Sequence, residues 1–205
     1  MPNPIQHIVF DIGQVLIHYD PHAGLRAVIP DDAEREWFLN TVCTSAWNLE
    51  QDRGRSWAEA EALLIAEWPD QADRIRAFRA NWPRMITGDI PQTVALFEGL
   101  IDAGRDVTML TNFAADTFVE ARARFGFLNR TRGVTVSGEV GLIKPDPAIY
   151  SLHQQSFDLE PGVTLFIDDN AANVAAAQAF GWQAVQYTGH HALVDDLAQR
   201  GVIPA

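Results

Sequence analysis

Cysteine and basic side chains are both scarce in this chain of 205 residues. Its single cysteine, Cys43, can form neither an internal disulfide nor a multi-thiolate metal site, which favours a reducing, cytoplasmic setting. We expect Cys43 to be a small buried apolar side chain. The 15 Lys and Arg residues are outnumbered by 27 Asp and Glu residues, and the net charge of −12 repels nucleic acids and anionic membranes. We therefore predict neither of these as a partner.

Long apolar segments are missing as well. No run approaches the ~18 residues that are needed to cross a bilayer. The stretch Ile8-Val9-Phe10 stops at Asp11, and no Lys or Arg precedes it, so we expect no signal peptide. Hydrophobic residues make up 47% of the chain and charged residues 20%, which is typical of globular proteins. The length allows one large domain, or one domain with a sizeable insert.

Short β-branched segments alternate with helical patterns in the outer parts of the chain. Such alternation predicts parallel β-α-β units and a doubly wound α/β sheet. The expected strands are residues 5–10, 106–110, 163–167 and 183–187, with a shorter β-rich piece at 133–143.

The tract between about residues 20 and 88 has helical patterns and no convincing strand. One expected helix starts at Asp31 or Asp32 and runs to about Thr41, because Asp favours the N-cap position. A tract of ~70 residues is too long for a plain connection within such a sheet, so we interpret it as an inserted helical cap. We predict that residues 1–17 and 89–205 form the α/β core and that residues 18–88 form the cap.

Polar side chains follow three of the expected strands. Asp11 follows the first strand, Thr111 and Asn112 end the second, and the pair Asp168-Asp169 ends another. Because the carboxyl ends of parallel strands meet at one edge of a sheet, we expect these side chains to converge. Lys144 lies in a nearby glycine- and proline-containing turn. Three carboxylates, a hydroxyl and an ammonium suit phosphoryl transfer, in which a carboxylate attacks phosphorus and cations offset the charge.

Four motifs built on these residues resemble, in the same order, those of the haloacid dehalogenase-like hydrolase superfamily. They are Phe10-Asp11-Ile12-Gly13-Gln14-Val15-Leu16, Leu110-Thr111-Asn112, Lys144-Pro145-Asp146-Pro147 and Phe166-Ile167-Asp168-Asp169-Asn170. The resemblance covers about residues 5–188 and implies a Rossmann-like core with a C1-type helical cap over a phosphate site. It also implies Mg²⁺-dependent hydrolysis of a small phosphorylated substrate.

The same resemblance implies a role for each motif. Asp11 is the expected nucleophile and becomes an aspartyl-phosphate. Lys144 is expected to act in catalysis and to bind phosphate, and we place Thr111 and Asn112 in the phosphate site with it. The expected Mg²⁺ ligands are Asp11, the backbone carbonyl of Gly13, Asp168 and Asp169.

Gly13 departs from the pattern that is commonest in this superfamily. Phosphatases of the family usually carry a second Asp at that position, which protonates the leaving group and later activates water. Loss of such an acid typically costs about 10²–10⁴ in rate when the leaving group is poor. We therefore predict a preference for sugar 1-phosphates, acyl phosphates or aryl phosphates. The prefix Asp-x-Gly-x-Val-Leu also resembles a subgroup that includes a glucose-1-phosphate phosphatase. His18 or a residue of the cap could supply the proton instead.

Two other functions stay open. The 2-haloacid dehalogenases share the fold and lack the second Asp, but by resemblance they carry an uncharged Ser pair where this chain has Asp168-Asp169. Adjacent carboxylates would repel the carboxylate of a haloacid, which favours the phosphatase. A degenerate site at Gly13 would instead fit a protein that binds a phosphorylated ligand without turnover.

The tryptophans and Asn173 complete the set of candidate residues. We expect four of the six tryptophans to pack in the core of the cap: Trp37, Trp57, Trp68 and Trp82. Trp47 lies in a less periodic stretch and is our candidate for a substrate contact. Asn173 could support the residues of the site, but we expect it to be a plain residue of a helix surface. The sequence leaves open a homodimer formed through aromatic side chains of the cap.

Overall fold

The core of the protein is a five-stranded parallel sheet, seen in a computed structural model that describes residues 4–204. The strand order is β5-β4-β1-β6-β7, and each neighbouring pair is parallel. The strands are β1 (His7–Phe10), β4 (Asp106–Thr111), β5 (Val134–Val136), β6 (Thr164–Asp168) and β7 (Gln183–Gln186). This arrangement confirms the predicted doubly wound α/β fold.

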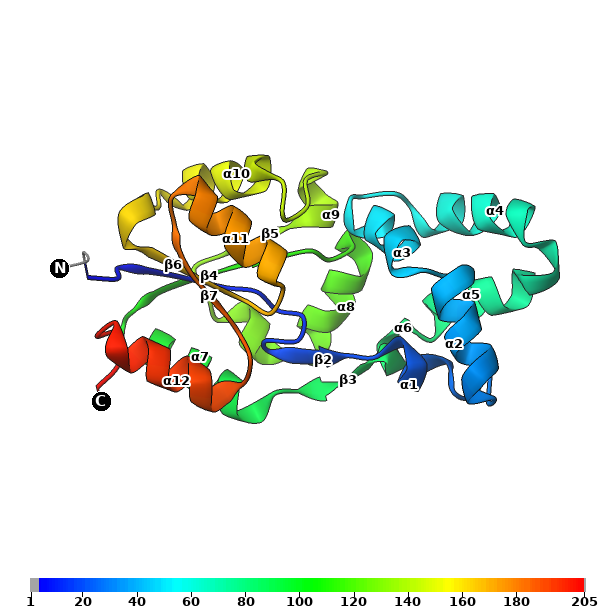
Figure 1. Cartoon of the computed structure of the whole chain (residues 1–205), viewed down its shortest axis with the longest axis horizontal. Coiled ribbons are helices and arrows are strands. Elements are labelled where there is room, and N and C mark those ends of the chain that lie inside the picture. Colours follow the sequence, from blue (N-terminus) through cyan, green and yellow to red (C-terminus); the bar gives the residue numbers. More distant parts are fainter. Residues whose placement is uncertain (1–3, 205) are drawn as a thin grey trace.

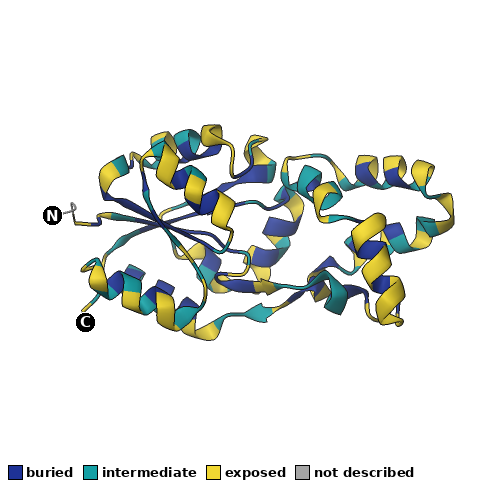
Figure 2. Cartoon of the chain, in the orientation of Figure 1, coloured by how far each residue is buried: buried dark blue, intermediate teal, exposed yellow. Residues whose placement is uncertain are grey.

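Helices cover both faces of this sheet (Figure 1). Alternate residues of a strand point to opposite faces. Accordingly, Ile8 and Phe10 of β1 belong to one hydrophobic cluster and Val9 to another. The first cluster includes side chains of α7 (Pro91–Asp102), α8 (Ala115–Arg124) and α12 (His190–Gln199), and the second includes side chains of α10 (Pro147–Phe157) and α11 (Ala171–Phe180). Figure 2 shows the sheet as a buried layer between helices whose outer faces are exposed.

A helical region is inserted between β1 and the rest of the sheet. It comprises α1 (Pro21–Leu25), α2 (Asp32–Thr41), α3 (Ser45–Asp52), α4 (Trp57–Glu67), α5 (Ala72–Ala80) and α6 (Trp82–Met85), with a 3₁₀ turn at Pro69–Gln71. The helix that was expected to start at Asp31 or Asp32 is α2. Of the two, Asp31 is the N-cap, because its side chain accepts a hydrogen bond from the Glu34 N–H. Figure 1 shows this region extending away from the sheet.

Two short antiparallel strands connect the helical region to the core. The chain leaves the core through β2 (Ile17–Tyr19) and returns through β3 (Ile86–Asp89), with an irregular register between His18 and Tyr19. The expectation of no strand up to residue 88 was wrong, because β3 begins at Ile86. This strand depends on pairing with β2, which lies about 70 residues earlier in the chain, and its own sequence, Ile-Thr-Gly-Asp, is a weak strand signal. The exact ranges of core and cap stay a prediction.

The expected β-rich piece at 133–143 was only partly correct. The strand β5 is three residues long, and the chain then forms α9 (Ser137–Val140). The Ser137 hydroxyl accepts a hydrogen bond from the Phe113 N–H at 2.8 Å, which ties this turn to the end of β4. A Cβ atom on Gly138 would lie 2.6 Å from the backbone nitrogen of Ala115. The absence of a side chain therefore allows α9 to approach the first turn of α8 closely.

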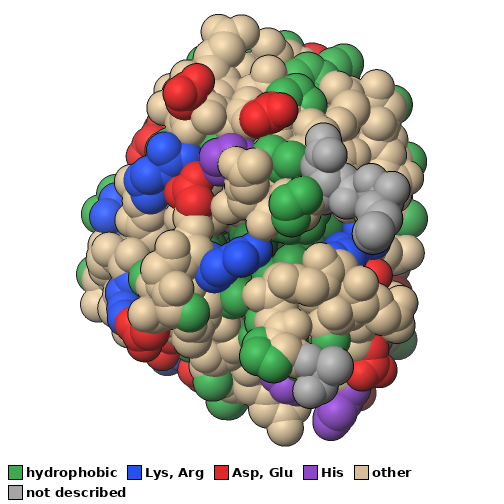
Figure 3. Space-filling model, turned by 90° about the vertical axis from the view of Figure 1, so that its left-hand side faces the viewer, with side chains coloured by type: hydrophobic (Ala, Val, Ile, Leu, Met, Phe, Trp, Pro, Cys, Tyr) green, Lys and Arg blue, Asp and Glu red, His purple; other side chains and the backbone are tan. Residues whose placement is uncertain are grey.

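Short 3₁₀ segments at Gly126–Asn129 and Pro161–Val163 precede the strands β5 and β6 of the core. On the face away from the cap, acidic and basic side chains lie next to one another (Figure 3), and one such pair joins Arg132 to Asp106 at 2.8 Å. Among residues 4–204, the structure contains no helix that is long and apolar enough to cross a membrane.

Candidate active site

Three aspartates meet at the carboxyl edge of the sheet. Asp11 directly follows β1, while Asp168 ends β6 and Asp169 comes next in the chain. The register aligns Phe10 with Ile167, so the two strands end side by side. One carboxylate oxygen of each of the three residues lies within 4.8 Å of the others. The convergence that was expected from the strand ends is therefore present.

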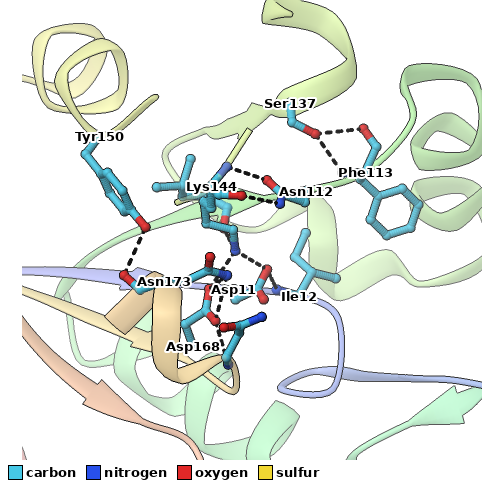
Figure 4. A network of polar contacts seen from close by, with 11 residues as sticks. Asp11, Ile12, Asn112, Phe113, Ser137, Lys144, Tyr150, Asp168 and Asn173 are labelled. Carbon is cyan, nitrogen blue, oxygen red and sulfur yellow. Dashed lines mark hydrogen bonds and ion pairs between the residues drawn. The ribbon is translucent and has the colours of Figure 1, made fainter. Parts of the chain in front are cut away.

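Lys144 lies between two of these carboxylates (Figure 4). Its Nζ atom is 2.8 Å from Asp11 Oδ1 and 2.7 Å from Asp168 Oδ2, and it also donates to the carbonyl of Leu110 at 3.0 Å. The side chain is 1% exposed, and it is the only lysine in the sequence. Lysine is rarely buried unless it is paired, and this one is paired with two acids.

Asn112 fixes the backbone of Lys144. Its side-chain oxygen accepts a hydrogen bond from the Lys144 N–H at 2.8 Å, and its amide nitrogen donates to the Lys144 carbonyl at 3.0 Å. This double contact joins the end of β4 to the turn before α10 (Figure 4). Asn112 also lines the cavity described below. Its contacts show a positioning role, and the expected contact with phosphate stays a prediction.

Asp168 is wholly buried and its two oxygens are held by neighbouring groups. Oδ1 accepts a hydrogen bond from the Asn170 N–H at 2.8 Å, and the Asn173 amide lies 3.1 Å from both oxygens. Asn173 is 6% exposed, so the expectation of a surface residue was wrong. It lies in the first turn of α11, where a side chain leans back towards the start of the helix. That direction is the signal that could have placed Asn173 at the site.

Burial and mutual attraction set the charges of this cluster. Burial raises the pKa of Asp11, the Lys144 ammonium opposes that rise, and the charge of Asp168 adds to it. Burial alone would lower the pKa of Lys144, but Asp11 and Asp168 outweigh burial and hold that pKa above its usual range. Burial, followed by the charge of Asp168, also raises the pKa of Asp169. Three acids around one base leave an excess of negative charge.

That excess charge makes the cluster suitable for a metal ion. Carboxylate oxygens are the ligands that hard divalent cations such as Mg²⁺ prefer, and Asp11, Asp168 and Asp169 supply them within one small volume. Lys144 alone does not neutralise the three carboxylates, and a bound metal ion would balance the remaining negative charge. The donor set therefore fits the cofactor that the sequence predicts.

A cavity of about 240 Å³ lies over this cluster, between the core and the helical region. Asp11, Gly13, Lys144 and Asp169 line its core side. Side chains of the inserted region close the other side: Tyr19, Asn48, Asp52, Trp57, Trp82 and Ile86. The inserted region is fixed to α8 in this arrangement, because Trp57 Nε1 donates to Asp116 at 3.1 Å and Arg79 forms an ion pair with the same residue.

Trp82 is buried in the hydrophobic core and Trp57 packs against it, as expected, and both side chains also line the cavity. Trp37 was expected in the same core but is 41% exposed. Trp47 does not line the cavity and packs edge-on against Trp57 and Phe78, with ring centroids 5.9 and 5.5 Å apart, so its expected contact with substrate stays a prediction. Helical spacing gives a residue's face but not which neighbour that face meets. Cys43 is buried, as expected.

Thr111 is placed at the end of β4 but does not line the cavity. Its side chain is 1% exposed, and its hydroxyl has no hydrogen-bond partner among the described residues. A buried hydroxyl without a partner is uncommon in folded proteins. Its expected contact with phosphate stays a prediction.

The sequence and structure are similar to those of known hydrolases. The family model described as haloacid dehalogenase-like hydrolase matches residues 5–181. The sesquiterpene phosphatase astK of Aspergillus oryzae is 26% identical over 202 residues, which cover 93% of this chain and 94% of that protein. The (S)-2-haloacid dehalogenase 1 of Pseudomonas sp. is 28% identical over 97 residues, or 47% of this chain and 42% of that protein.

A solved structure with bound ligands is also similar. The HAD family enzyme BT-2542 of Bacteroides thetaiotaomicron, in complex with magnesium and inorganic phosphate, has a TM-score of 0.71 and 19% sequence identity. The match covers 89% of this chain and 93% of that chain. At this identity the likeness shows that the two proteins share a fold.

Proposed function

The chain belongs to the haloacid dehalogenase-like hydrolases, and we propose that it is a Mg²⁺-dependent phosphatase of a small phosphorylated molecule. The observation that carries this proposal is the cluster of Asp11, Asp168 and Asp169 within 4.8 Å, with Lys144 between two of them. The similarity to a sesquiterpene phosphatase over nearly the whole chain supports it, and so does the magnesium and phosphate bound in an enzyme of the same fold.

Asp11 has the contacts of an oriented nucleophile. Its Oδ1 atom accepts a hydrogen bond from the Ile12 N–H at 2.7 Å and faces Lys144 at 2.8 Å. These contacts fix the carboxylate through Oδ1, and we assign the attack on phosphorus to Oδ2. An Asp11 aspartyl-phosphate forms as the bond to the leaving oxygen breaks, and water then releases phosphate from Asp11.

The remaining residues bind and orient the phosphoryl group. Lys144 and Thr111 hold its oxygens as negative charge redistributes in the transition state. Asp11, Asp168, Asp169 and the carbonyl of Gly13 would hold Mg²⁺. When bound, this cation supplies positive charge that offsets the repulsion between the nucleophile and the phosphate.

The cavity walls favour an apolar organic group on the substrate. Trp57, Trp82 and Phe113 line it together with Ile17 and Ile86, and such surfaces gain most from contact with hydrocarbon. This lining, with the similarity to astK, supports a terpenyl or aryl phosphate. A sugar 1-phosphate remains the competing candidate, which rests on the missing acid at Gly13.

Phosphate release from a matched panel tests the proposal. The panel contains a terpenyl phosphate, glucose 1-phosphate, glucose 6-phosphate and an aryl phosphate, each with Mg²⁺ and with a chelator. We expect turnover with Mg²⁺ only, highest for the apolar substrates, and none in Asp11→Asn. Binding without phosphate release would instead establish a non-catalytic protein. Halide release from a 2-haloacid without metal would establish a dehalogenase, which the charge of Asp169 in the cavity disfavours.

A further inference from the structure

Asp52 is a carboxylate of the inserted region that faces the same cavity as Asp11. It is the last residue of α3 and lines the cavity together with Asp11 and Gly13. Gly13 occupies the position where phosphatases of this family usually have a second Asp, as described above. The cavity therefore lacks an acid at position 13 and has one on its opposite wall.

The backbone at the end of α3 lies close to the backbone of the core. A Cβ atom on Gly54 would lie 3.3 Å from the Gly138 carbonyl, and one on Gly141 would lie 4.0 Å from the Arg53 carbonyl. On the core side, the Ala114 N–H is close enough to Asp52 to oppose the rise of its pKa. Asp52 thus lies at the boundary between the two parts of the molecule, beside the start of α8.

The surroundings of Asp52 favour its protonated form. The nearby cations have other partners, since Arg53 lies 3.7 Å from Glu50 and Arg55 binds Gln51 and the Trp47 carbonyl. Burial raises the pKa of Asp52 to about 7, against the opposing effect of the Ala114 N–H. Tyr19 lines the same cavity. Its pKa is raised mainly by burial and in addition by the charge of Asp52. A carboxyl group that titrates near neutrality can both give and take a proton.

We propose that Asp52 is the general acid of this enzyme and replaces the carboxylate that is absent at position 13. The inference rests on the proposed phosphatase function. As Asp11 bonds to phosphorus and the ester bond breaks, the Asp52 proton passes to the leaving oxygen, and an alcohol departs. The Asp52 carboxylate then takes a proton from the water that attacks the aspartyl-phosphate. This step regenerates the acid and releases phosphate from Asp11.

Leaving-group dependence separates this role from a structural one. Benzyl phosphate has a poor leaving group and para-nitrophenyl phosphate has a good one, whereas both fit an aromatic-lined cavity. In Asp52→Asn we expect kcat/KM for benzyl phosphate to fall by about 10²–10³-fold. We expect kcat/KM for para-nitrophenyl phosphate to fall by less than about tenfold, because the nitrophenolate leaves without protonation. Glu50→Gln, on the same helix but outside the cavity lining, is the matched control and keeps the wild-type ratio.

A pH profile and a second-site rescue complete the test. For benzyl phosphate, kcat/KM of the wild type is expected to decline above about pH 7, where Asp52 loses its proton, and this decline is absent in Asp52→Asn. A Cβ atom at position 13 would meet nothing within 4 Å, so the chain has room for Gly13→Asp. In the double variant Gly13→Asp/Asp52→Asn, we expect kcat/KM for benzyl phosphate to be at least about tenfold higher than in Asp52→Asn alone.

The outcomes separate the two proposals. If the wild type releases phosphate but Asp52→Asn loses activity equally on both esters, or loses none, Asp52 is not the acid and the phosphatase assignment stands. If the wild type hydrolyses neither ester with Mg²⁺, the proposed function itself fails. Activity of the variant towards para-nitrophenyl phosphate also reports that it is folded.

Discussion

The ammonium of Lys144 lies 2.8 Å from Oδ1 of Asp11, and both side chains are buried. More than 130 residues separate them in the sequence, and two hydrogen bonds between the Asn112 side chain and the Lys144 backbone hold that backbone at the end of β4. The expected nucleophile and its counter-charge are therefore oriented by the fold before any substrate arrives. Such preorganisation lowers the cost of stabilising new charge in a transition state.

Replacing Lys144 by Met should damage both stability and activity. The variant leaves Asp11 and Asp168 buried without their shared cation, and breaking a buried ion pair from one side costs about 3–5 kcal/mol. We expect the free energy of unfolding in urea to fall by about 3 kcal/mol without Mg²⁺ and phosphate release to fall at least ~10²-fold. Arg122→Met, a change on an exposed face of α8, is the control. Wild-type stability in Lys144→Met would contradict the role given to this pair.

Magnesium should stabilise the folded protein independently of turnover. A ligand that binds only the native state at about 100 times its Kd adds about 2.7 kcal/mol. We therefore expect the Tm in MgCl₂ to exceed the Tm with a chelator, and Asp169→Asn to lose most of this difference. Asp102→Asn, which removes a surface partner of Arg130, should keep it. Identical melting curves of the wild type with and without Mg²⁺ would count against the metal site.

His153 should make the protein less stable as the pH falls below about 6.5. It is fully buried between the hydroxyls of Thr108 and Thr135, at 3.0 and 2.8 Å, and burial lowers its pKa from 6.5 to about 3. Between these values the unfolded chain binds a proton that the native state does not. This residue therefore removes about 1.4 kcal/mol of stability per pH unit on acidification.

Comparison with His153→Gln isolates that effect. The acids with raised pKa, such as Asp52, act in the opposite direction, because the folded state then binds the proton and acidification favours it. They are unchanged in the variant and cancel in the difference. We expect urea unfolding between pH 6.5 and 5 to show a shallower loss of stability for His153→Gln. Equal slopes would show that His153 is protonated in the folded protein.

Two glycines of the core should respond to alanine with opposite signs. Gly138→Ala places a methyl group where a Cβ atom would be 2.6 Å from the Ala115 nitrogen and 2.8 Å from the Phe113 carbonyl. We expect it to lower the free energy of unfolding by about 2 kcal/mol. Gly99 lies within α7 with nothing within 4 Å of its Cβ position, and Gly99→Ala should stabilise by about 0.5–1 kcal/mol. Melting curves of both variants measure the contrast.

The sequence predicts the parts of this site that are attached to strand ends. Asp11, Thr111 and Asp168 follow or end apolar strands whose carboxyl ends must meet in a parallel sheet, so their convergence follows from local patterns. Lys144 has no such pattern, because it lies in a turn whose position is not fixed by a strand end, and the resemblance to a family supports its place at the site. The core fold and the helical insert could be predicted because both can be recognised along the sequence. The fold follows from the alternation of strand and helix patterns, and the insert follows from the length of the helical tract.

The helical wall of the cavity could not be predicted in this way. Whether Trp47 or Trp57 faces the cavity depends on how α3 and α4 pack against α8. The spacing of residues along one helix does not contain that information. The same holds for Asp52, which looks like an ordinary acid at the end of a helix until α9 and Ala114 are placed beside it. The short strand β3 likewise depends on a partner far away in the chain.

The burial of the only lysine gives the protein an internal reporter. Apart from the α-amino group, an acylating dye has one amine target in this sequence, and the fold shields it behind two carboxylates. Dye incorporation at that position therefore measures how often the core opens, without any engineered label.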